Sequence, residues 1–374
     1  MMNPDQINLF RRLFAIPNRW KNVLYVHAPF CRQKCYYCVY GSKEPDNPAE
    51  VLDFYQRRLP AQIQDMGELL PEVPFDQIYF GGGTPTIVDP QVLEGIYNQI
   101  PHFDRIPFKA GEASPDTITD EHIDLFARRG FSYISLGVQT LSERVLEANN
   151  RPHVSPHRLR EICRRLEQGG ITANLDLILF LDTGEERDLN ITRRDLELLM
   201  DDVKPASITL HYHYHIPKRL PLRRAMMETA QEMMGRFPAY SCVNSLLEEE
   251  DAREDMLHSA AYRLMRHAKD MDYYMMPKIP WMHPYGHNML ALGEYLQFRV
   301  RYNFYYIYDF IDKYTYARVL EQNRSVALDY DRVRRRLGFQ PVGYEDMAEF
   351  FADPDGRKQF KQIVAEANLP FVGQ

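Results

Sequence analysis

The sequence predicts an α/β fold, a partial (β/α)6 barrel of the TIM type with a mixed, mainly helical C-terminal domain. Three observations support this prediction. Short apolar runs rich in β-branched and aromatic residues alternate with longer segments whose apolar residues recur three and four positions apart. Such alternation is typical of parallel strands connected by right-handed helical crossovers. Six units of this kind are too few to close an eight-stranded barrel, and the alternation stops after His215.

The strands and helices of the barrel follow in order along the chain. The first strand, NVLYVH, has the composition of a buried strand and runs directly into a cysteine-rich loop. The expected strands are Asn22–His27, Gln77–Phe80, Phe108–Ala113, Tyr133–Gly137, Thr172–Phe180 and Ser207–Tyr212. The expected helices between them are Val51–Leu70, Pro90–Gln99, Glu121–Arg129, Pro156–Gln168 and Glu185–Met200. Parallel barrels carry their reactive groups at the carboxyl ends of the strands, so residues at those ends are candidates for function.

The chain of 374 residues is long enough for two domains. After His215 the sequence becomes rich in tyrosine and methionine, and apolar residues at helical spacing predict a helix over Met256–Ala268. We therefore place a domain boundary near Pro217. The expected parts are an N-terminal arm (residues 1–20), the barrel (residues 21–217) and a C-terminal substrate or lid domain (residues 218–374).

Composition and charge narrow the class of protein. Hydrophobic residues make up 45% of the chain and charged residues 26%, which is typical of a soluble globular protein. The net charge of −7 argues against a general nucleic-acid binder, because such proteins neutralise phosphates with a basic surface. The longest apolar run, around Leu177–Leu181, is too short to span a membrane, and the first residues lack a cleavable signal pattern. We expect a cytoplasmic protein that binds neither nucleic acid nor membrane.

Cysteine spacing gives the first indication of chemistry. Three of the five cysteines, Cys31, Cys35 and Cys38, follow the first strand with the spacing C-x3-C-x2-C, whereas Cys163 and Cys242 stand alone. A clustered, odd set in a cytoplasmic protein favours metal or redox chemistry over disulfides. The spacing allows two sites. One is a four-iron cubane with one iron left open, and the other is a zinc site completed by His27 or another ligand.

Polar residues also stand at the ends of the later strands. Gly81–Pro85 follow the second strand, Glu112 ends the third, Gln139 follows the fourth, and Asp176 lies within the fifth. In the sixth strand and just beyond it, alternate positions place three histidines on one polar face: His211, His213 and His215. We expect these histidines to contact the substrate as acids, bases or partners of its carboxylates.

Six segments in order carry a family resemblance. They are YVHAPFCRQKCYYC, YFGGGTPT, EASPDTIT, SLGVQT, NRPH and NLDLILF. Together they resemble the radical S-adenosylmethionine (SAM) superfamily and, within it, the oxygen-independent coproporphyrinogen III oxidase-like (HemN-like) family. The resemblance runs from Leu24 to Leu181 and disfavours the zinc site, because a zinc site does not require the glycine turn or the polar strand ends.

The resemblance implies a cofactor pair and a set of contacts. In the family, three cysteines bind a [4Fe-4S] cluster and S-adenosylmethionine chelates its open iron, so the metal ligands and catalytic residues expected here are Cys31, Cys35 and Cys38. One electron from the cluster splits the sulfonium into methionine and a 5′-deoxyadenosyl radical. The residues that match family positions around this cofactor are Tyr25, Tyr37, Gly82, Gly83, Thr84, Glu112, Gln139, Arg151 and Asp176.

Two departures from the family shape the expected reaction. The cysteine loop continues as Val39 and Tyr40, where coproporphyrinogen oxidases carry a further cysteine, and FLDTGEE replaces a glycine- and proline-containing turn after the fifth strand. We therefore favour methyl or methylene transfer, or carbon–carbon bond formation such as cyclopropanation, on a biosynthetic small molecule with a second SAM. The alternatives are tetrapyrrole oxidation like that of coproporphyrinogen III oxidase, and a non-catalytic haem carrier.

Basic residues surround the cysteine loop of this acidic chain. They are Arg11, Arg12, Arg19, Lys21, Arg32, Lys34 and Lys43. An acidic electron donor of the flavodoxin or ferredoxin type could dock there through complementary charge. The alternative is a solvated rim without a partner.

Overall fold

The computed structural model describes residues 8, 11–12, 14–15, 22–38, 42–179, 181, 189–212, 228–229, 232–244, 261–266, 288–293, 298–302, 305–310 and 362. Within these ranges the chain forms one nine-stranded sheet and a separate two-stranded hairpin. No helix within them has both the length and the apolar composition to cross a bilayer.

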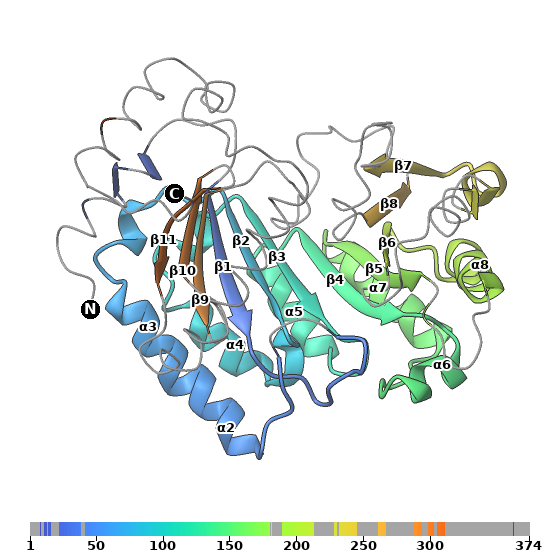
Figure 1. Ribbon diagram of the computed structural model, residues 1–374, viewed down its shortest axis with the longest axis horizontal. Helices are drawn as coiled ribbons and strands as arrows, with labels where there is room; N and C mark the ends of the chain where they lie inside the picture. Colours follow the sequence, from blue (N-terminus) through green and yellow to red (C-terminus); the bar gives the residue numbers. More distant parts are fainter. Residues whose placement is uncertain are drawn as a thin grey trace, which may run out of the picture.

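The centre of the sheet is the predicted run of parallel strands. These are β1 (Asn22–Ala28), β2 (Gln77–Gly82), β3 (Phe108–Ala113), β4 (Tyr133–Gln139), β5 (Thr172–Leu179) and β6 (Ser207–Tyr212). Each pairs in parallel with the next along the chain, so the strands appear side by side in sequence order in Figure 1. The α/β fold with an open, partial barrel is therefore confirmed.

Strands from the C-terminal part extend both edges of this sheet. Strand β9 (Asn288–Gly293) pairs in parallel with β1, while β8 (Ala261–Arg266) pairs antiparallel with β6 and with β7 (Tyr240–Asn244). The hairpin consists of β10 (Phe298–Tyr302) and β11 (Tyr305–Phe310). Segments before and after Pro217 thus share one sheet, and the domain boundary near that residue stays a prediction.

The predicted helix over Met256–Ala268 is wrong where the structure describes it, because Ala261–Arg266 is strand β8. The segment AYRLMR has apolar residues dense enough to fit both a helical and an extended period. Backbone pairing with the otherwise open edge of β6, from Ser207 to His211, favours the strand.

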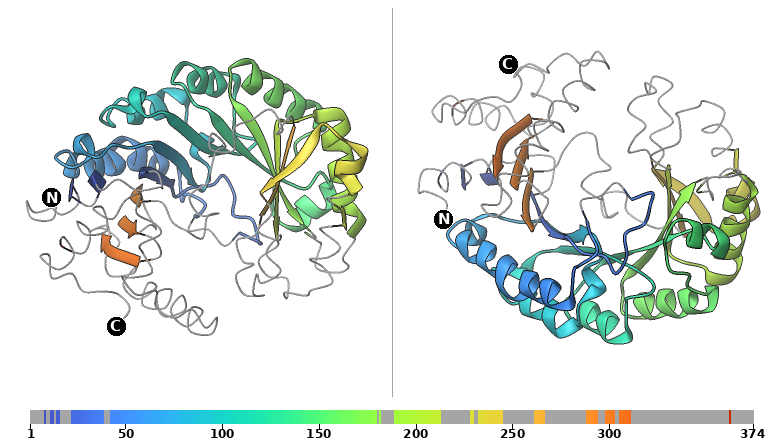
Figure 2. Two further views of the ribbon diagram at one scale, coloured as in Figure 1. Left: turned by 90° about the horizontal axis from the view of Figure 1, so that it is seen from above. Right: turned by 60° about the horizontal axis from the view of Figure 1, so that its bottom comes forward.

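Helices cover the convex outer face of the sheet as an arc (Figure 2). The α-helices are α2 (Pro48–Asp53), α3 (Leu59–Asp65), α4 (Pro90–Tyr97), α5 (Asp120–Arg128), α6 (Glu143–Ala148), α7 (Pro156–Gln168) and α8 (Leu189–Leu198). Single π-helical turns lie at Phe54–Arg58 and Leu199–Val203, and 3-10 turns at Leu70–Glu72, Pro85–Ile87 and Phe103–Arg105. Capping residues fix where several helices begin. For example, the Asn47 side chain accepts a hydrogen bond from Glu50 N just before Pro48, the first residue of α2.

The two faces of the sheet are filled differently. The outer face packs apolar side chains against the helices, as where Phe80 of β2 meets Tyr97 of α4 with ring centroids 4.9 Å apart. The amino-terminal level of the inner face is plugged by a second cluster consisting of Val23, Tyr25, Tyr79, Ala110 and Tyr133. Polar residues follow at the carboxyl-terminal level.

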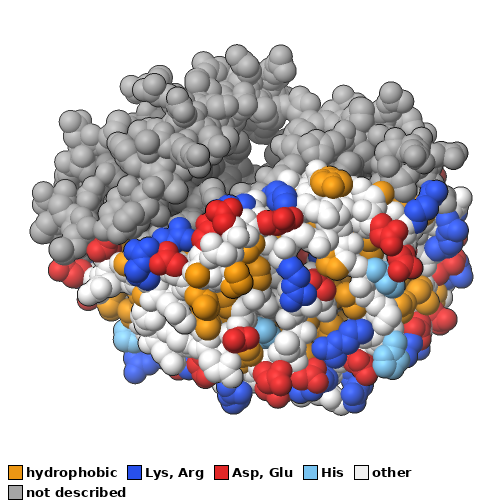
Figure 3. Space-filling view, turned by 90° about the horizontal axis from the view of Figure 1, so that it is seen from below, with side chains coloured by type: hydrophobic (Ala, Val, Ile, Leu, Met, Phe, Trp, Pro, Cys, Tyr) orange, Lys and Arg blue, Asp and Glu red, His pale blue; other side chains and the backbone are white. Residues whose placement is uncertain are grey.

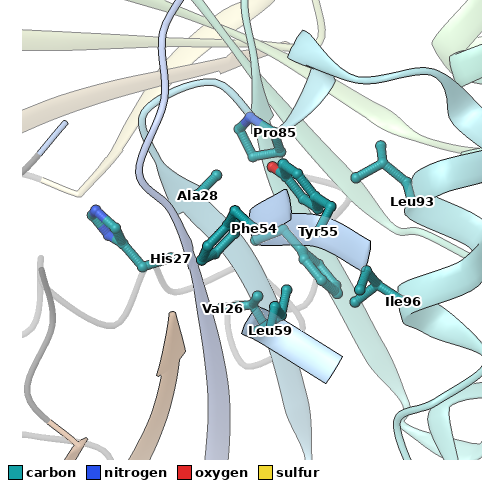
Figure 4. A pocket seen from close by; sticks show the side chains of 10 residues that line it. Val26, His27, Ala28, Phe54, Tyr55, Leu59, Pro85, Leu93 and Ile96 are labelled. Atoms are coloured by element: carbon teal, nitrogen blue, oxygen red, sulfur yellow. The ribbon is translucent and has the colours of Figure 1, made fainter. Parts of the chain in front are cut away.

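A small apolar pocket lies under the outer helices. Figure 4 shows Phe54, Tyr55 and Leu59 facing Pro85, Leu93 and Ile96 there, while His27 points to the other side of β1. The pocket therefore belongs to the helix–sheet packing, and His27 belongs to the inner face. On the molecular face in Figure 3, basic and acidic side chains of the described residues are interspersed. Ion pairs between helices, such as Arg165 with Asp124 at 2.8 Å, connect such charges.

Candidate active site

The cysteine loop begins where β1 ends and is closed by backbone hydrogen bonds. Cys31 N donates to Lys43 O at 3.0 Å, and Lys43 N donates to Pro29 O at 2.9 Å. Inside the loop, Cys38 N donates to Cys35 O at 3.1 Å. Tyr36 N donates to the carbonyl of Asn149 just after α6, at 3.2 Å. The three cysteines are thus held on a loop anchored at both ends and in its middle.

The glycine turn after β2 binds directly to the start of this loop. Gly83 N donates to Ala28 O at 2.6 Å, and Thr84 N donates to Phe30 O at 2.7 Å. A Cβ on Gly83 would lie 2.4 Å from Phe30 O, and Gly82 has a φ of +106°, which disfavours any side chain. The glycines are therefore required by the close approach of two backbones at the carboxyl ends of neighbouring strands.

A hydrogen-bond donor of this chain reaches each of the three sulfurs. Thr84 Oγ1 lies 3.5 Å from Cys31 Sγ, Arg151 Nη1 lies 3.5 Å from Cys35 Sγ, and Lys34 Nζ lies 3.4 Å from Cys38 Sγ. Burial raises the pKa of the Cys31 thiol, hydrogen bonds from Thr84 and Ser42 lower it, and the charges of Cys38 and Cys35 raise it. The three thiols are close enough to influence one another.

This donor set fits an iron–sulfur cluster. Thiolates are its usual ligands, and donors around the sulfurs stabilise its negative charge. In the described part of the chain, no three histidine, cysteine, aspartate or glutamate side chains are gathered for a single metal ion. A cubane does not need such convergence, because each thiolate binds a different iron. His27, the expected fourth zinc ligand, instead has its Nδ1 within 3.1 Å of Tyr25 Oη.

Arg151 links the cysteine loop to the end of β4. Its guanidinium also donates to Gly137 O and, at 3.3 Å, to Ser114 Oγ. A Cβ on Gly137 would lie 2.9 Å from both Arg151 Nη2 and Gln139 Nε2. These two side chains therefore occupy the space that a side chain at position 137 would fill. Gln139 has a φ of +73°, an uncommon value for a residue with a side chain.

Tyr37 is buried beside Cys35, together with Val145 and Leu181. Its hydroxyl has no nitrogen or oxygen partner among the described residues. Burial raises the pKa of this hydroxyl far above its ordinary value, and the nearby Arg151 lowers it only in part. The ring is therefore part of the core, yet no nitrogen or oxygen atom of the described residues partners its hydroxyl, as one usually does for a buried hydroxyl.

Glu112 lies at the end of β3 with both carboxylate oxygens engaged. Tyr79 Oη donates to one at 2.9 Å, and Gly82 N donates to the other at 3.0 Å. Burial raises the pKa of Glu112 to about 7; the Tyr79 hydrogen bond lowers it, and the charge of Asp176 raises it. Tyr25 adds its hydroxyl close by, since a Cβ on Gly81 would lie 3.1 Å from both Tyr25 Oη and Glu112 Cδ.

Asp176 stands in a polar network on the inner faces of β4, β5 and β6. Ser135 Oγ donates to it at 2.6 Å and Asn174 Nδ2 at 2.8 Å, and His211 Nε2 lies 3.3 Å from Oδ1. Asn174 is fully buried, and its Oδ1 accepts from the hydroxyls of Ser207 and Thr209 at 2.7 and 2.9 Å. His213 and His215 lie outside the described residues. The exposed fraction of the side chain is 18% for Asp176 and 27% for His211, so both side chains remain accessible to a ligand.

The structure thus brings most predicted site residues to one end of the sheet and adds partners that sequence reasoning missed. Tyr79, Ser114, Ser135 and Asn174 orient the predicted side chains. Asn174 could have been found as an inward residue, because it stands two positions before Asp176 on the same strand, whereas its pairing with Ser135 depends on strand register.

The basic residues around the loop are mostly engaged within the chain. Arg32 lies 3.2 Å from Asp116, and Lys43 lies 2.5 Å from Glu50. Arg11 lies 3.9 Å from Glu72. Arg19 and Lys21 are outside the described residues, and an electron donor docked here stays a prediction.

Comparisons with known proteins agree with this geometry. Residues 25–196 match the family model described as "Radical SAM superfamily". The oxygen-independent coproporphyrinogen III oxidase of Pseudomonas aeruginosa is 31% identical over 54% of this chain and 44% of its own length. The heme chaperone HemW of Lactococcus lactis is 30% identical over 51% of this chain and 50% of its own length. The chain therefore matches half or less of the length of these relatives.

One solved structure is similar across most of the chain. It is the coproporphyrinogen III oxidase HemN of Escherichia coli, described as a radical SAM enzyme, with a TM-score of 0.61 and 17% identity over 90% of this chain and 83% of that one. At this identity the similarity shows the fold.

Proposed function

Because residues 25–196 of this chain belong to the radical SAM superfamily, with HemN-like relatives, we propose that it cleaves S-adenosylmethionine at a [4Fe-4S] cluster held by Cys31, Cys35 and Cys38. One observation carries the proposal. The three thiols, the glycine turn and the polar ends of β3 to β5 occupy the same end of the sheet, joined by hydrogen bonds from Gly83 N to Ala28 O and from Arg151 to Cys35.

When bound, the cluster and the sulfonium supply a one-electron reductive cleavage that yields methionine and a 5′-deoxyadenosyl radical. The chain binds and orients the cofactor. Glu112 and Asp176 offer carboxylate oxygens to its ammonium or ribose hydroxyls, because carboxylates accept strong hydrogen bonds. The remaining proposed contacts are Tyr25, Tyr37, Gly82, Gly83, Thr84, Gln139 and Arg151. The cluster of Val23, Tyr25, Tyr79, Ala110 and Tyr133, which we call the aromatic plug, closes the other end of the inner face and would keep water away from the cofactor.

For the substrate we propose a tetrapyrrole, which the names of the relatives support. The transfer of a one-carbon unit from a second SAM, which the sequence favours, finds no support in those names, so one SAM molecule is proposed. We assign His211, whose Nε2 lies 3.3 Å from Asp176 Oδ1, as a contact for a substrate carboxylate. The second candidate is haem binding without turnover, which the similarity to a heme chaperone supports.

The test is anaerobic purification and reconstitution with iron and sulfide, followed by SAM and dithionite. The proposal expects about four irons per chain and 5′-deoxyadenosine by mass spectrometry. With coproporphyrinogen III, an oxidase also releases carbon dioxide, whereas a haem carrier gives a Soret band on haem addition and no turnover. A colourless chain that contains zinc instead of iron would refute the assignment of an iron–sulfur cluster to these cysteines.

A pair of cysteine variants gives the matched control. Cys35→Ala should lose the cluster and 5′-deoxyadenosine formation while the chain stays folded. Cys163→Ala removes a thiol that is buried in α7, away from the loop, where burial raises its pKa to about 12. It should keep both properties. Equal loss in the two variants would show a general folding defect, and retained cleavage in Cys35→Ala would contradict the ligand assignment.

A further inference from the structure

Lys34, between two of the cysteines, is fixed at both its backbone and its side chain. Its N donates to Glu44 Oε1 at 2.6 Å, and its carbonyl accepts from Asn150 Nδ2 at 2.9 Å. Among the described residues, its half-buried side chain reaches the acceptors Cys38 Sγ at 3.4 Å and Ser42 Oγ at 3.0 Å. The ammonium is thus directed at a sulfur and held there, unlike a lysine on a solvated rim.

We propose that Lys34 is a positioning residue that raises the reduction potential of the cluster through a charge-assisted hydrogen bond to the Cys38 thiolate. The inference rests on the proposed function, since it requires the cluster. Reduction adds an electron to a negatively charged group, and a positive donor beside a ligating sulfur stabilises the added charge. The cluster accepts its electron more readily as a result.

The three thiols differ in the donors they receive, which makes this effect separable. Cys31 receives a neutral hydroxyl from Thr84. Cys35 receives the guanidinium of Arg151, which also contacts Gly137 and belongs to the proposed SAM site. Lys34 lies outside the proposed SAM contacts, so its replacement alters the charge at the cluster without removing one of them.

A matched control lies in the same loop. Lys43 carries the same charge, but its Nζ lies 2.5 Å from Glu50 Oε1 and not at a sulfur. Replacing Lys43 or Lys34 by glutamine changes the net charge of the chain equally. Only the Lys34 change removes a donor from a cysteine ligand.

The experiment is a redox titration of the reconstituted cluster, followed by electron paramagnetic resonance without SAM, on wild type, Lys34→Gln, Lys34→Arg and Lys43→Gln. We expect Lys34→Gln to lower the equilibrium constant for reduction about tenfold, which is a shift of about 59 mV to more negative potential for one electron. Lys34→Arg should keep most of the wild-type value, and Lys43→Gln should keep all of it.

Each other outcome has a defined meaning. A midpoint of Lys34→Gln equal to that of wild type, or an equal shift in Lys43→Gln, overturns the proposal. Loss of iron from Lys34→Gln while Lys34→Arg retains it assigns Lys34 to cluster retention and also overturns potential tuning. A wild-type chain that binds no cluster instead overturns the proposed function, which the iron analysis shows before any titration.

Discussion

Replacing Glu112 by glutamine separates stability from cofactor binding at the end of β3. In the folded chain the pKa of Glu112 is about 7, against an ordinary value of 4.5, and burial is the main cause. A carboxyl whose pKa is raised by folding stabilises the protein fully below about pH 4.5, and this contribution is lost as the pH rises through 7. The ionised group is therefore a stability cost at neutral and alkaline pH.

The size of the effect follows from the two pKa values. The difference between about 7 and 4.5 corresponds to about 3 kcal/mol between pH 4 and pH 8. Glutamine removes this dependence, but its amide nitrogen must face either Tyr79 Oη or Gly82 N, both of which donate to the carboxylate. That mismatch costs about 1–3 kcal/mol at every pH. Glu112→Gln should thus be less stable than wild type at pH 5 and should equal or exceed it at pH 8.

The assay is urea unfolding of both proteins without SAM at pH 5, 6, 7 and 8. The informative quantity is the difference in unfolding free energy between wild type and variant, because other titrating groups cancel in it. Glu147→Gln is the control, since Glu147 is exposed on α6 and its loss removes the same charge. Parallel stability curves for wild type and Glu112→Gln across this range would refute the reasoning, as would an equal change in the control.

Four further variants test the geometry of the site and of the elements around it. Gly83→Ala should destabilise the chain and lower its iron content, because a Cβ would lie 2.4 Å from Phe30 O. The control Gly95→Ala, at a position of α4 with open space around it, should instead stabilise the chain by about 0.5–1 kcal/mol in thermal unfolding. Asn174→Ala should cost at least about 2 kcal/mol in urea unfolding, since it leaves several buried polar groups without their partner, and a neutral effect would contradict the network. Asp195→Asn should gain stability over wild type as the pH rises from 4 to 7, by up to about 3 kcal/mol, because burial raises the pKa of Asp195 from 3.8 to about 6; a pH-independent difference would argue against it.

The central strands could be predicted from the sequence because both of their faces are buried. Phe108–Ala113 has the predicted bounds, and the apolar run around Leu175 gives β5 almost to the residue. The helix expected over Val51–Leu70 is interrupted instead. Pro60 has no amide hydrogen to donate to the carbonyl of residue 56, and a π-helical turn at Phe54–Arg58 precedes it.

The site could be predicted only as far as its motif residues. The cysteines and the glycine turn are local features, so their sequence spacing indicates their proximity. The partners of Asp176 depend on strand register, which places Ser135 beside Asn174 and Asn174 beside Ser207. Register results from packing across the whole sheet and cannot be derived from any single segment.

The two levels of the inner face are connected through one side chain. Tyr79 packs in the aromatic plug, stacked on Tyr25 with ring centroids 6.0 Å apart, yet its hydroxyl reaches the next level and donates to Glu112. A carboxylate held by one tyrosine and one backbone amide keeps its orientation only while the plug keeps its packing. The aromatic residues therefore do more than exclude water, because they also position the carboxylate that we assign to the cofactor. This dependence explains why a reactive site at the strand ends requires a rigid, fully packed level beneath it.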